Sequence, residues 1–252
     1  MREYEDQEYW NAVYASEEEY LEEKSVAEGS DGEEEFDKKI LDAAVRKAVL
    51  DVGCGDAGFT IRIADLVREV VGVDFSEKAI SKALENITQT KATNIKVQLT
   101  NANKLPFPGE TFDIVVSRRG PVTHSVLTLS EADRVLNKGG LLMEITIGER
   151  DKESLTRIFC RGQMYDVQEK VSVTKEKMLK SVGFDVIEIE EYLAYEIFDS
   201  LRDLVIRLKS APIIPNFDVH RDRASLEAIE KTLATPRGIR TEVHRVTIIG
   251  RK

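Results

Sequence analysis

The sequence predicts an α/β fold with a doubly wound, mostly parallel sheet and helices on both faces. From residue 48 onward, short apolar segments alternate with amphipathic ones, and such a succession of strands and helices is typical of a parallel sheet. Ile114, Val115 and Val116 form a continuous β-branched run, as in a strand that is buried on both faces. These two observations set the fold class.

The individual elements follow from the same pattern, with Ser76 as a good helix N-cap and Gly183 as a good C-cap. The expected strands are 48–52, 70–73, 95–99, 112–117, 141–147, 184–189 and 243–250. The expected helices are 59–67, 76–86, 130–136, 174–181, 196–209 and 223–233.

The negative charge of the chain is concentrated at its N-terminus. The formal net charge is −10, yet residues 1–35 hold 14 acidic and two basic side chains, and the remainder carries a small positive excess. Trp10, Val13 and Tyr14 share one face of a helix, and a disordered acidic tail would be poor in aromatic residues. We therefore expect a docked aromatic helix followed by a solvated acidic connector. The nearly neutral remainder disfavours nucleic acid as a partner.

Cysteines and histidines are few and scattered. Cys54 and Cys160 form no metal or redox spacing, and His124, His220 and His244 form no zinc spacing, so no metal is expected. No apolar run approaches the roughly 20 residues of a membrane span, and the first residues are acidic, unlike a signal peptide. We expect a cytoplasmic protein without a membrane partner.

A glycine-rich loop follows the first strand of the predicted sheet. Residues 53–58, Gly-Cys-Gly-Asp-Ala-Gly, match the pattern G-x-G-x-x-G, and Asp74 ends the next strand, 21 residues after Gly53. Glycines let a ligand approach the backbone closely, and the acid suits ribose hydroxyls. The loop therefore indicates a ligand with an adenosine moiety, and a nicotinamide dinucleotide is one such ligand.

Asp51 separates the possible ligands, because a dinucleotide site usually has an apolar residue two positions before the first glycine. A carboxylate is costly to bury at a strand tip without a partner. The amino group and sulfonium of S-adenosyl-L-methionine would bring positive charge close to it. The alternative is a carboxylate that caps loop amides, which leaves the other motifs unexplained.

At this point the chain resembles the class I S-adenosylmethionine-dependent methyltransferases, and within them the broad type 11 group. Residues 49–55 look like motif I and residues 71–76 like the second motif. Residues 101–107 and 110–115 are similar to the third and fourth motifs, and 134–140 to the loop before strand five. The resemblance covers roughly residues 46–148. It implies a Rossmann-like methyltransferase sheet of seven strands, the last antiparallel, with S-adenosyl-L-methionine as cofactor and S-adenosyl-L-homocysteine as product.

The resemblance also assigns cofactor-binding roles to matching residues. It implies that Asp51 and the loop backbone face the methionine end and that Asp74 takes both ribose hydroxyls. Phe75 would lie against the adenine, with core packing as the alternative. The implied set is Asp51, Gly53, Cys54, Gly55, Asp74, Phe75, Asn101, Ala102, Ser117 and Arg118.

Two positions depart from the family pattern. Ala57 stands where the family's third loop glycine is common, so a slightly reshaped loop is expected. Asn101 stands where an acid is usual. Its amide oxygen can still accept a hydrogen bond from the adenine amino group, but it brings no charge.

The methyl acceptor is expected beyond the fourth strand, at residues 117–124. Their sequence lacks the Asn/Asp-Pro-Pro-aromatic signature of amide or adenine nitrogen methylation. His124 is the candidate base, because its unperturbed pKa lies near neutrality, with a surface position as the alternative. Arg118 is a candidate for an anionic substrate, unless it pairs with a helix acid. Tyr165 is a candidate pocket residue unless it only packs, and Glu144 is expected to be structural.

The leading hypothesis is a methyltransferase that acts on a small or medium-sized molecule. The alternatives are an RNA methyltransferase acting on rRNA or tRNA, for which we find no basic run, and a non-catalytic protein that binds S-adenosylmethionine. An NAD-linked oxidoreductase is disfavoured by Asp51. The expected organisation is an N-terminal cap (1–35), a core (36–194), a helical lid (195–238) and a final strand (239–252). The chain is compatible with a monomer or a homodimer.

Overall fold

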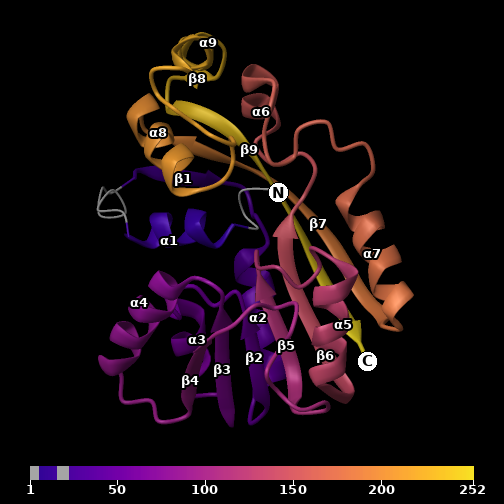
Figure 1. The fold of residues 1–252 in the computed structure, drawn as a ribbon. Helices are drawn as coiled ribbons and strands as arrows, with labels where there is room; N and C mark the ends of the chain where they lie inside the picture. Colours follow the sequence, from indigo (N-terminus) through magenta and orange to yellow (C-terminus); the bar gives the residue numbers. More distant parts are fainter. Residues whose placement is uncertain (1–5, 16–22) are drawn as a thin grey trace. The chain divides into compact units, whose positions relative to one another are not determined.

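The computed structural model describes residues 6–15 and 23–252 (Figure 1). They form two compact units, each discontinuous in sequence. The sheet unit comprises residues 33–146, 172–190 and 246–252, and the insertion unit comprises residues 147–171 and 191–245 with the described part of 1–32. Residues 147–171 and 191–194, which we assigned to the core, thus fall in the insertion unit.

The sheet unit confirms the doubly wound α/β prediction. Five parallel strands lie in the order β6-β5-β2-β3-β4, and β9 and then β7 follow beside β6. The last strand, β9, runs antiparallel to β6 (Figure 1). The bounds are β2 (Ala48–Val52), β3 (Glu69–Asp74), β4 (Ile95–Leu99), β5 (Phe112–Arg118), β6 (Leu136–Ile147), β7 (Asp185–Phe198) and β9 (Gly238–Arg251).

The predicted count of seven strands is wrong. The described residues also contain β1 (Ser25–Glu28), which pairs antiparallel with β7, and β8 (Ala234–Thr235), which pairs with β9. Both are short and lack the apolar alternation that marks a strand in a sequence, so backbone pairing alone defines them. Residues 25–28, predicted as solvated connector, are therefore part of a sheet. Residues 1–5 and 16–22, which include the start of that connector and both ends of the segment expected to hold the N-terminal helix, lie outside the described residues.

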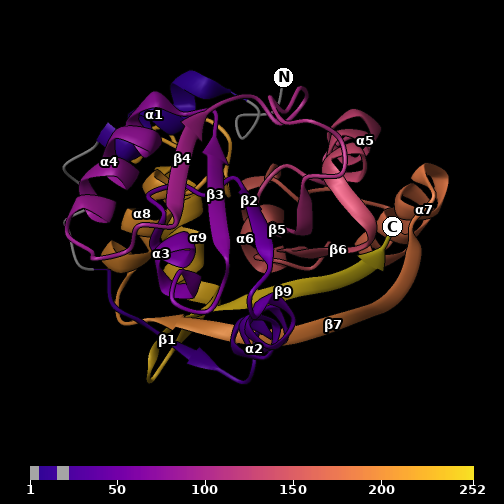
Figure 2. The ribbon, with the colours of Figure 1, turned by 90° about the horizontal axis from the view of Figure 1, so that it is seen from below.

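Helices cover both faces of the sheet unit, and α2 and α5 lie on opposite sides in Figure 2. The predicted connector ends at residue 35, but α2 begins at Glu33, with three glutamates in its first turn. Negative charge there is favourable, because the N-terminus of a helix carries positive partial charge. The helices are α2 (Glu33–Ala44), α3 (Gly58–Ile63), α4 (Glu77–Thr88), α5 (Val126–Val135) and α7 (Val171–Val182).

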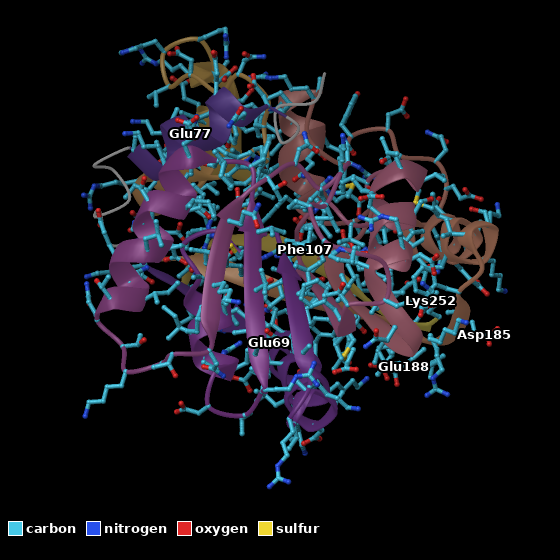
Figure 3. All side chains as sticks on the ribbon, turned by 60° about the horizontal axis from the view of Figure 1, so that its bottom comes forward. Glu69, Glu77, Phe107, Asp185, Glu188 and Lys252 are labelled. Atoms are coloured by element: carbon cyan, nitrogen blue, oxygen red, sulfur yellow. The ribbon has the colours of Figure 1, made fainter. Side chains whose placement is uncertain are left out.

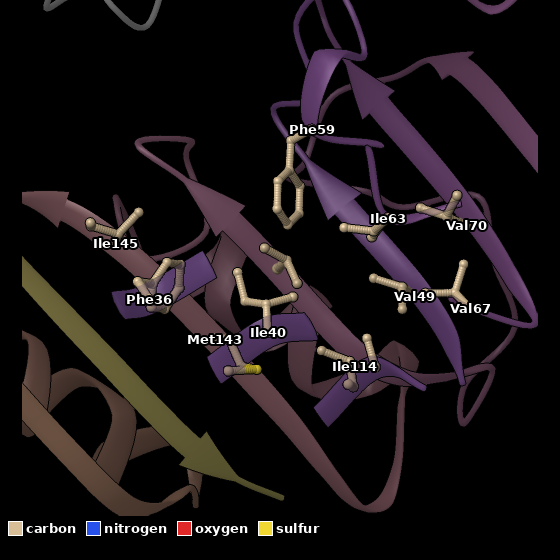
Figure 4. Packing of buried hydrophobic residues seen from close by; sticks show 12 residues of the cluster. Phe36, Ile40, Val49, Phe59, Ile63, Val67, Val70, Ile114, Met143 and Ile145 are labelled. Carbon is tan, nitrogen blue, oxygen red and sulfur yellow. The ribbon is translucent and has the colours of Figure 1, made fainter. Parts of the chain in front are cut away.

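The core of the sheet unit explains why α2 is a helix. Phe36, Ile40 and Ala44 lie on one of its faces and are buried against apolar side chains of β2, β5 and β6 (Figure 4). Their spacing of four residues is that of one helix face. This packing fixes the carboxyl ends of the parallel strands, where ligands bind in such sheets.

The insertion unit has a hydrophobic core of its own. Its helices are α1 (Gln7–Ala15), α6 (Glu153–Phe159), α8 (Leu201–Ser210) and α9 (Arg223–Thr232). The core includes Leu155, Phe198, Leu204 and Ile229. The helix expected near the N-terminus is present as α1, and the one expected at 223–233 as α9. The helix expected at 196–209 begins only at Leu201, because residues 196–198 still pair within β7. The roles of these helices as cap and lid stay predictions. No helix of the described residues is long and apolar enough to cross a membrane.

Candidate functional site

The carboxyl ends of β2, β3 and β5 bring the glycine loop and two carboxylates together. The backbone amides of Gly53 and Cys54 both donate to the carbonyl of Val73, at 2.8 and 3.1 Å. The amide of Gly55 donates to Oδ2 of Asp74 at 3.0 Å. The loop after β2 is therefore held directly against the tip of β3, as the motif predicts.

The glycines of this region are required by geometry. Gly53 has a φ of +80°, which is favourable only for glycine, and a Cβ there would meet Gly120 and Pro121 at 3.1 Å. A Cβ on Gly120 would lie 2.4 Å from the carbonyl oxygen of Val52. The loop after β5 thus passes directly over the loop after β2.

Ala57 shows where the chain departs from the family pattern. Its φ is +66°, in the left-handed region, and it immediately precedes α3. A residue with a Cβ is strained in this conformation by about 1 kcal/mol or more, which explains why glycine is common at this position. Alanine thus adopts here a conformation that favours glycine, and the expected reshaping of the loop stays a prediction.

Asp74 is anchored by backbone amides. Its Oδ1 accepts from the amide of Ser76 at 2.9 Å, and its Oδ2 accepts from Gly55. Burial nevertheless raises the pKa of its carboxyl, against the opposing effect of the amides of Ser76, Gly55 and Phe75. The side chain is thus held in one orientation at the tip of β3, in a poorly hydrated place, where a ligand with paired hydroxyl donors would stabilise its charge.

Asp51 is more deeply buried than Asp74. Its residue is 2% exposed, and Oδ2 accepts from the hydroxyl of Thr60 at 2.7 Å. Burial raises the pKa of this carboxyl to about 6, although Thr60 and the charge of Arg118 act in the opposite direction. Thr60 and Arg118 thus offset only part of the cost of burying this charge. A positively charged group of a ligand would stabilise the carboxylate further.

Arg118 and its neighbour Arg119 both pair with acids of α2, so Arg118 does pair with a helix acid, which was the alternative to an anionic substrate. Arg118 Nε lies 3.0 Å from Asp37 Oδ1, and its NH2 lies 3.1 Å from Glu33 Oε2. Arg119 NH1 lies 3.1 Å from Glu33 Oε1. The guanidinium of Arg118 also lies over the ring of Phe59, 4.9 Å from its centroid. Arg118 is therefore fixed at the tip of β5.

The other predicted cofactor residues differ in accessibility. Ser117 is fully buried, and its hydroxyl donates to the carbonyl of Val52 at 3.3 Å. Asn101 is exposed, and its Oδ1 accepts from the amide of Asn103. Ala102 is buried, and Phe75 is partly exposed. Ser117 thus joins two strand tips, whereas Asn101 and Phe75 present accessible surface.

The predicted catalytic residues are not brought together within one unit. His124 and Arg118 belong to the sheet unit, and His124 is exposed in the turn before α5. Tyr165 belongs to the insertion unit and is 45% exposed. The roles of these three residues in an acceptor pocket stay predictions.

Three residues of this region escaped the sequence reasoning: Thr60, Glu33 and Asp37. Thr60 lies nine residues after Asp51, where the first turn of α3 returns to β2. Glu33 was assigned to a connector. The signal that identifies Glu33 and Asp37 is their spacing of four residues, which places both on one face of a helix.

A groove of about 490 Å³ lies over β3 and β4, but it is not at this site. Figure 3 labels two of its lining residues, Glu69 and Phe107. It reaches Glu69, the first residue of β3, and so lies away from the carboxyl end of that strand. Phe107 and Phe112 form one wall, with ring centroids 5.1 Å apart. Because ligands of parallel sheets bind at the carboxyl ends of the strands, we do not assign the groove to the candidate site.

A buried histidine of the insertion unit gives a pH prediction. His244 is 1% exposed, and its Nδ1 accepts from the amide of Arg150 at 3.2 Å. Burial lowers its pKa, although the charges of Glu149, Glu191 and Asp151 oppose this. The unfolded chain therefore binds the extra proton first, so the contribution of His244 to stability is complete above the unfolded pKa of about 6.5 and is lost as the pH falls toward the lower folded pKa.

We expect His244→Gln to flatten the fall in stability of the protein below pH 6.5. Urea unfolding at several pH values measures this slope. His220→Gln, at an exposed position, is the control and should leave it unchanged. An unaltered slope in His244→Gln would contradict the prediction.

Comparison with known proteins identifies the family. The family model described as a methyltransferase domain matches residues 44–192, more than half of the chain. The chain belongs to this family. Among curated methyltransferases, a demethylmenaquinone methyltransferase of Geobacillus sp. is 36% identical over 107 residues, which are 40% of this chain and 46% of that enzyme. The match thus spans about half the length of that relative.

Solved structures share the fold of this methyltransferase domain. A candidate methyltransferase of Bacillus halodurans has a TM-score of 0.67 at 22% identity and covers 87% of this chain and 99% of its own. The [4+2]-cyclase SpnF has a TM-score of 0.66 at 14% identity and covers 100% of this chain and 97% of its own. These likenesses establish the fold alone, and SpnF shows that proteins of this fold are named for more than one reaction.

Proposed function

We propose that this protein is an S-adenosyl-L-methionine-dependent methyltransferase acting on a small or medium-sized molecule. The observation that carries the proposal is the pair of poorly hydrated carboxylates, Asp51 and Asp74, on neighbouring strand tips beside a glycine loop. Membership of the methyltransferase domain family supports the same reading.

The donor set fits the cofactor. Asp51 would hold the amino group of the methionine moiety, which supplies the cation that its buried carboxylate lacks. Asp74 would hold the ribose hydroxyls through its two oxygens. Phe75 and the amide of Ala102 would face the adenine, with Asn101 at its edge. When bound, the cofactor supplies a methyl group activated on a sulfonium, and the protein's part is alignment and exclusion of water.

The acceptor side of the sheet unit favours a molecule with an apolar part. Val126 and Leu127 directly follow the loop after β5, and their exposed fractions are 53% and 57%. Large apolar side chains at a strand's carboxyl end are suited to an apolar ligand surface. The relatives named for demethylmenaquinone make a quinone-like acceptor the first class to test. We propose His124 as the base for a protonated acceptor.

Binding of S-adenosylhomocysteine, measured by calorimetry, tests the cofactor assignment. We expect Asp74→Ala to weaken this binding about 100-fold, because charge-assisted hydrogen bonds of about 1.5–3 kcal/mol are lost. NAD is the control ligand and should not bind. Asp65→Asn, at an exposed acid of the sheet unit, is the control variant. Equal affinity of the wild type and Asp74→Ala would refute the role of Asp74.

A further inference from the structure

Glu144 is a buried acid that the proposed function does not use. It lies in β6 and is 0% exposed, and its carboxyl oxygens have no well-formed hydrogen bond among the described residues, although the hydroxyl and amide of Thr123 lie beside them. Burying such a group without a partner costs about 1–3 kcal/mol or more. An apolar side chain in the middle of this strand would avoid the cost. The presence of an acid at this position therefore needs an explanation.

The residue next to Glu144 in space is Thr123, in the loop after β5. Thr123 is also 0% exposed, and its hydroxyl likewise has no well-formed hydrogen bond among the described residues. The hydroxyl and amide of Thr123 are close enough to favour ionisation of Glu144, yet burial dominates and raises the pKa of that carboxyl. The carboxyl group of Glu144 can accept a hydrogen bond from the hydroxyl or the amide of Thr123.

Lys175 of α7 reaches Thr123 from another element. Its Nζ donates to the backbone carbonyl of Thr123 at 2.6 Å, and its charge also acts on Glu144. Thr123 is thus contacted through its backbone by α7, and its hydroxyl lies beside β6. Thr123 is therefore contacted by two elements, β6 and α7, that are both distant from it in sequence.

The loop itself packs tightly against the strand tips. Ser117 of β5 is in register with Glu144 of β6, and a Cβ on Gly120 would lie 2.7 Å from the hydroxyl of Ser117. His124 follows Thr123 directly, and α5 begins at Val126. A small displacement of Thr123 would therefore move both His124 and the exposed apolar residues of the first turn of α5.

We propose that Glu144 and Lys175 hold Thr123 from two sides and thereby position the loop 119–125 for the methyl acceptor. Glu144 is a positioning residue and does not touch the acceptor. That the loop faces a methyl acceptor rests on the proposed function. The positioning of the loop by Glu144 and Lys175 can be measured independently of that function.

Hydrogen exchange of loop amides tests the positioning directly. Glu144→Leu and Lys175→Met should each accelerate exchange in residues 119–125 at least tenfold. Glu144→Gln should exchange like the wild type, because its amide oxygen can still accept a hydrogen bond from Thr123. Lys177→Met, at an exposed lysine of the same helix, is the control. The proposal is overturned if the amides of residues 119–125 exchange in Lys175→Met at the wild-type rate. It is also overturned if they exchange in Glu144→Gln as fast as in Glu144→Leu.

The imidazole NMR signals give a second readout, since the chain has three histidines and His124→Gln assigns the signal of His124. That signal should move in Glu144→Leu and in Lys175→Met and stay in place in Lys177→Met. If Glu144→Leu fails to fold, Lys175→Met and Thr123→Val carry the test. An unmoved His124 signal in these variants counts against the proposal.

Binding and turnover separate this inference from the proposed function. S-adenosylhomocysteine should bind Glu144→Leu within twofold of the wild type, because Asp51 and Asp74 are untouched. Turnover of a short-chain demethylated naphthoquinol should fall mainly through a higher KM. A wild type that binds no S-adenosylhomocysteine refutes the proposed function, and the exchange result then decides the positioning of the loop alone.

Discussion

Asp51→Asn is expected to stabilise the protein at pH 8 and to weaken its binding of S-adenosylmethionine. The folded pKa of Asp51, about 6, lies above the ordinary value of 3.8, so the folded state binds the extra proton between these values. The contribution of Asp51 to stability is therefore complete below pH 3.8 and is lost as the pH rises through 6. A difference of about two pKa units corresponds to ~3 kcal/mol of unfolding free energy, which the wild type loses when Asp51 ionises. The uncharged amide of the Asp51→Asn variant does not ionise and so avoids this loss.

The difference in unfolding free energy between Asp51→Asn and the wild type, measured in urea at pH 5 and at pH 8, tests this expectation. The variant should gain stability mainly at the higher pH, and the hydroxyl of Thr60 can still donate to the amide oxygen. Asp65→Asn should show no such pH-dependent gain. A variant that is equally destabilised at both pH values would show that ionisation of Asp51 is not the source of the cost.

The binding part of the prediction has its own control ligand. Methylthioadenosine contains the adenosine moiety but lacks the amino acid end of the cofactor. Asp51→Asn should weaken the binding of S-adenosylmethionine at least tenfold and leave the binding of methylthioadenosine unchanged. Asp74→Ala should weaken the binding of both ligands. Equal losses for the two ligands in Asp51→Asn would place Asp51 elsewhere than at the amino group.

Glu196→Ala is expected to be the most destabilising change in the insertion unit, at ~3–5 kcal/mol. Lys152 has a side chain that is 4% exposed, and its Nζ lies 2.6 Å from Glu196 Oε2 and 2.9 Å from the hydroxyl of Thr241. Glu196 also pairs with Arg207 at 3.2 Å. Burial disfavours the ionised form of Glu196, but these two cations outweigh it and lower its pKa. Removing the acid leaves the charge of Lys152 buried without its partner.

A second substitution distinguishes this cause from a general loss of packing. Adding Lys152→Met to Glu196→Ala removes the stranded charge, so the double variant should recover most of the lost stability in urea unfolding. Glu230→Ala, at an exposed acid of α9, should have little effect. A double variant as unstable as Glu196→Ala would refute the explanation by charge burial.

The sequence predicted the strand tips better than their surroundings. The motif Asp51 to Gly55 and the acid Asp74 were placed correctly at the ends of β2 and β3, because a buried parallel strand and its following glycine turn are encoded by adjacent residues. The helix α2 was missed, because its first turn reads as a continuation of the acidic segment. Its apolar face becomes evident only against the sheet that it covers.

What the sequence by itself determined is the fold class, the family and the two carboxylates of the candidate site, since each depends on local spacing. Only the tertiary structure decided that Arg118 pairs with acids of α2, that Thr123 lies between Glu144 and Lys175, and that Glu196 neutralises a buried lysine. These contacts join residues that are between 21 and 85 positions apart. The physical reason is that the cost of a buried charge depends on which distant group the fold brings to it.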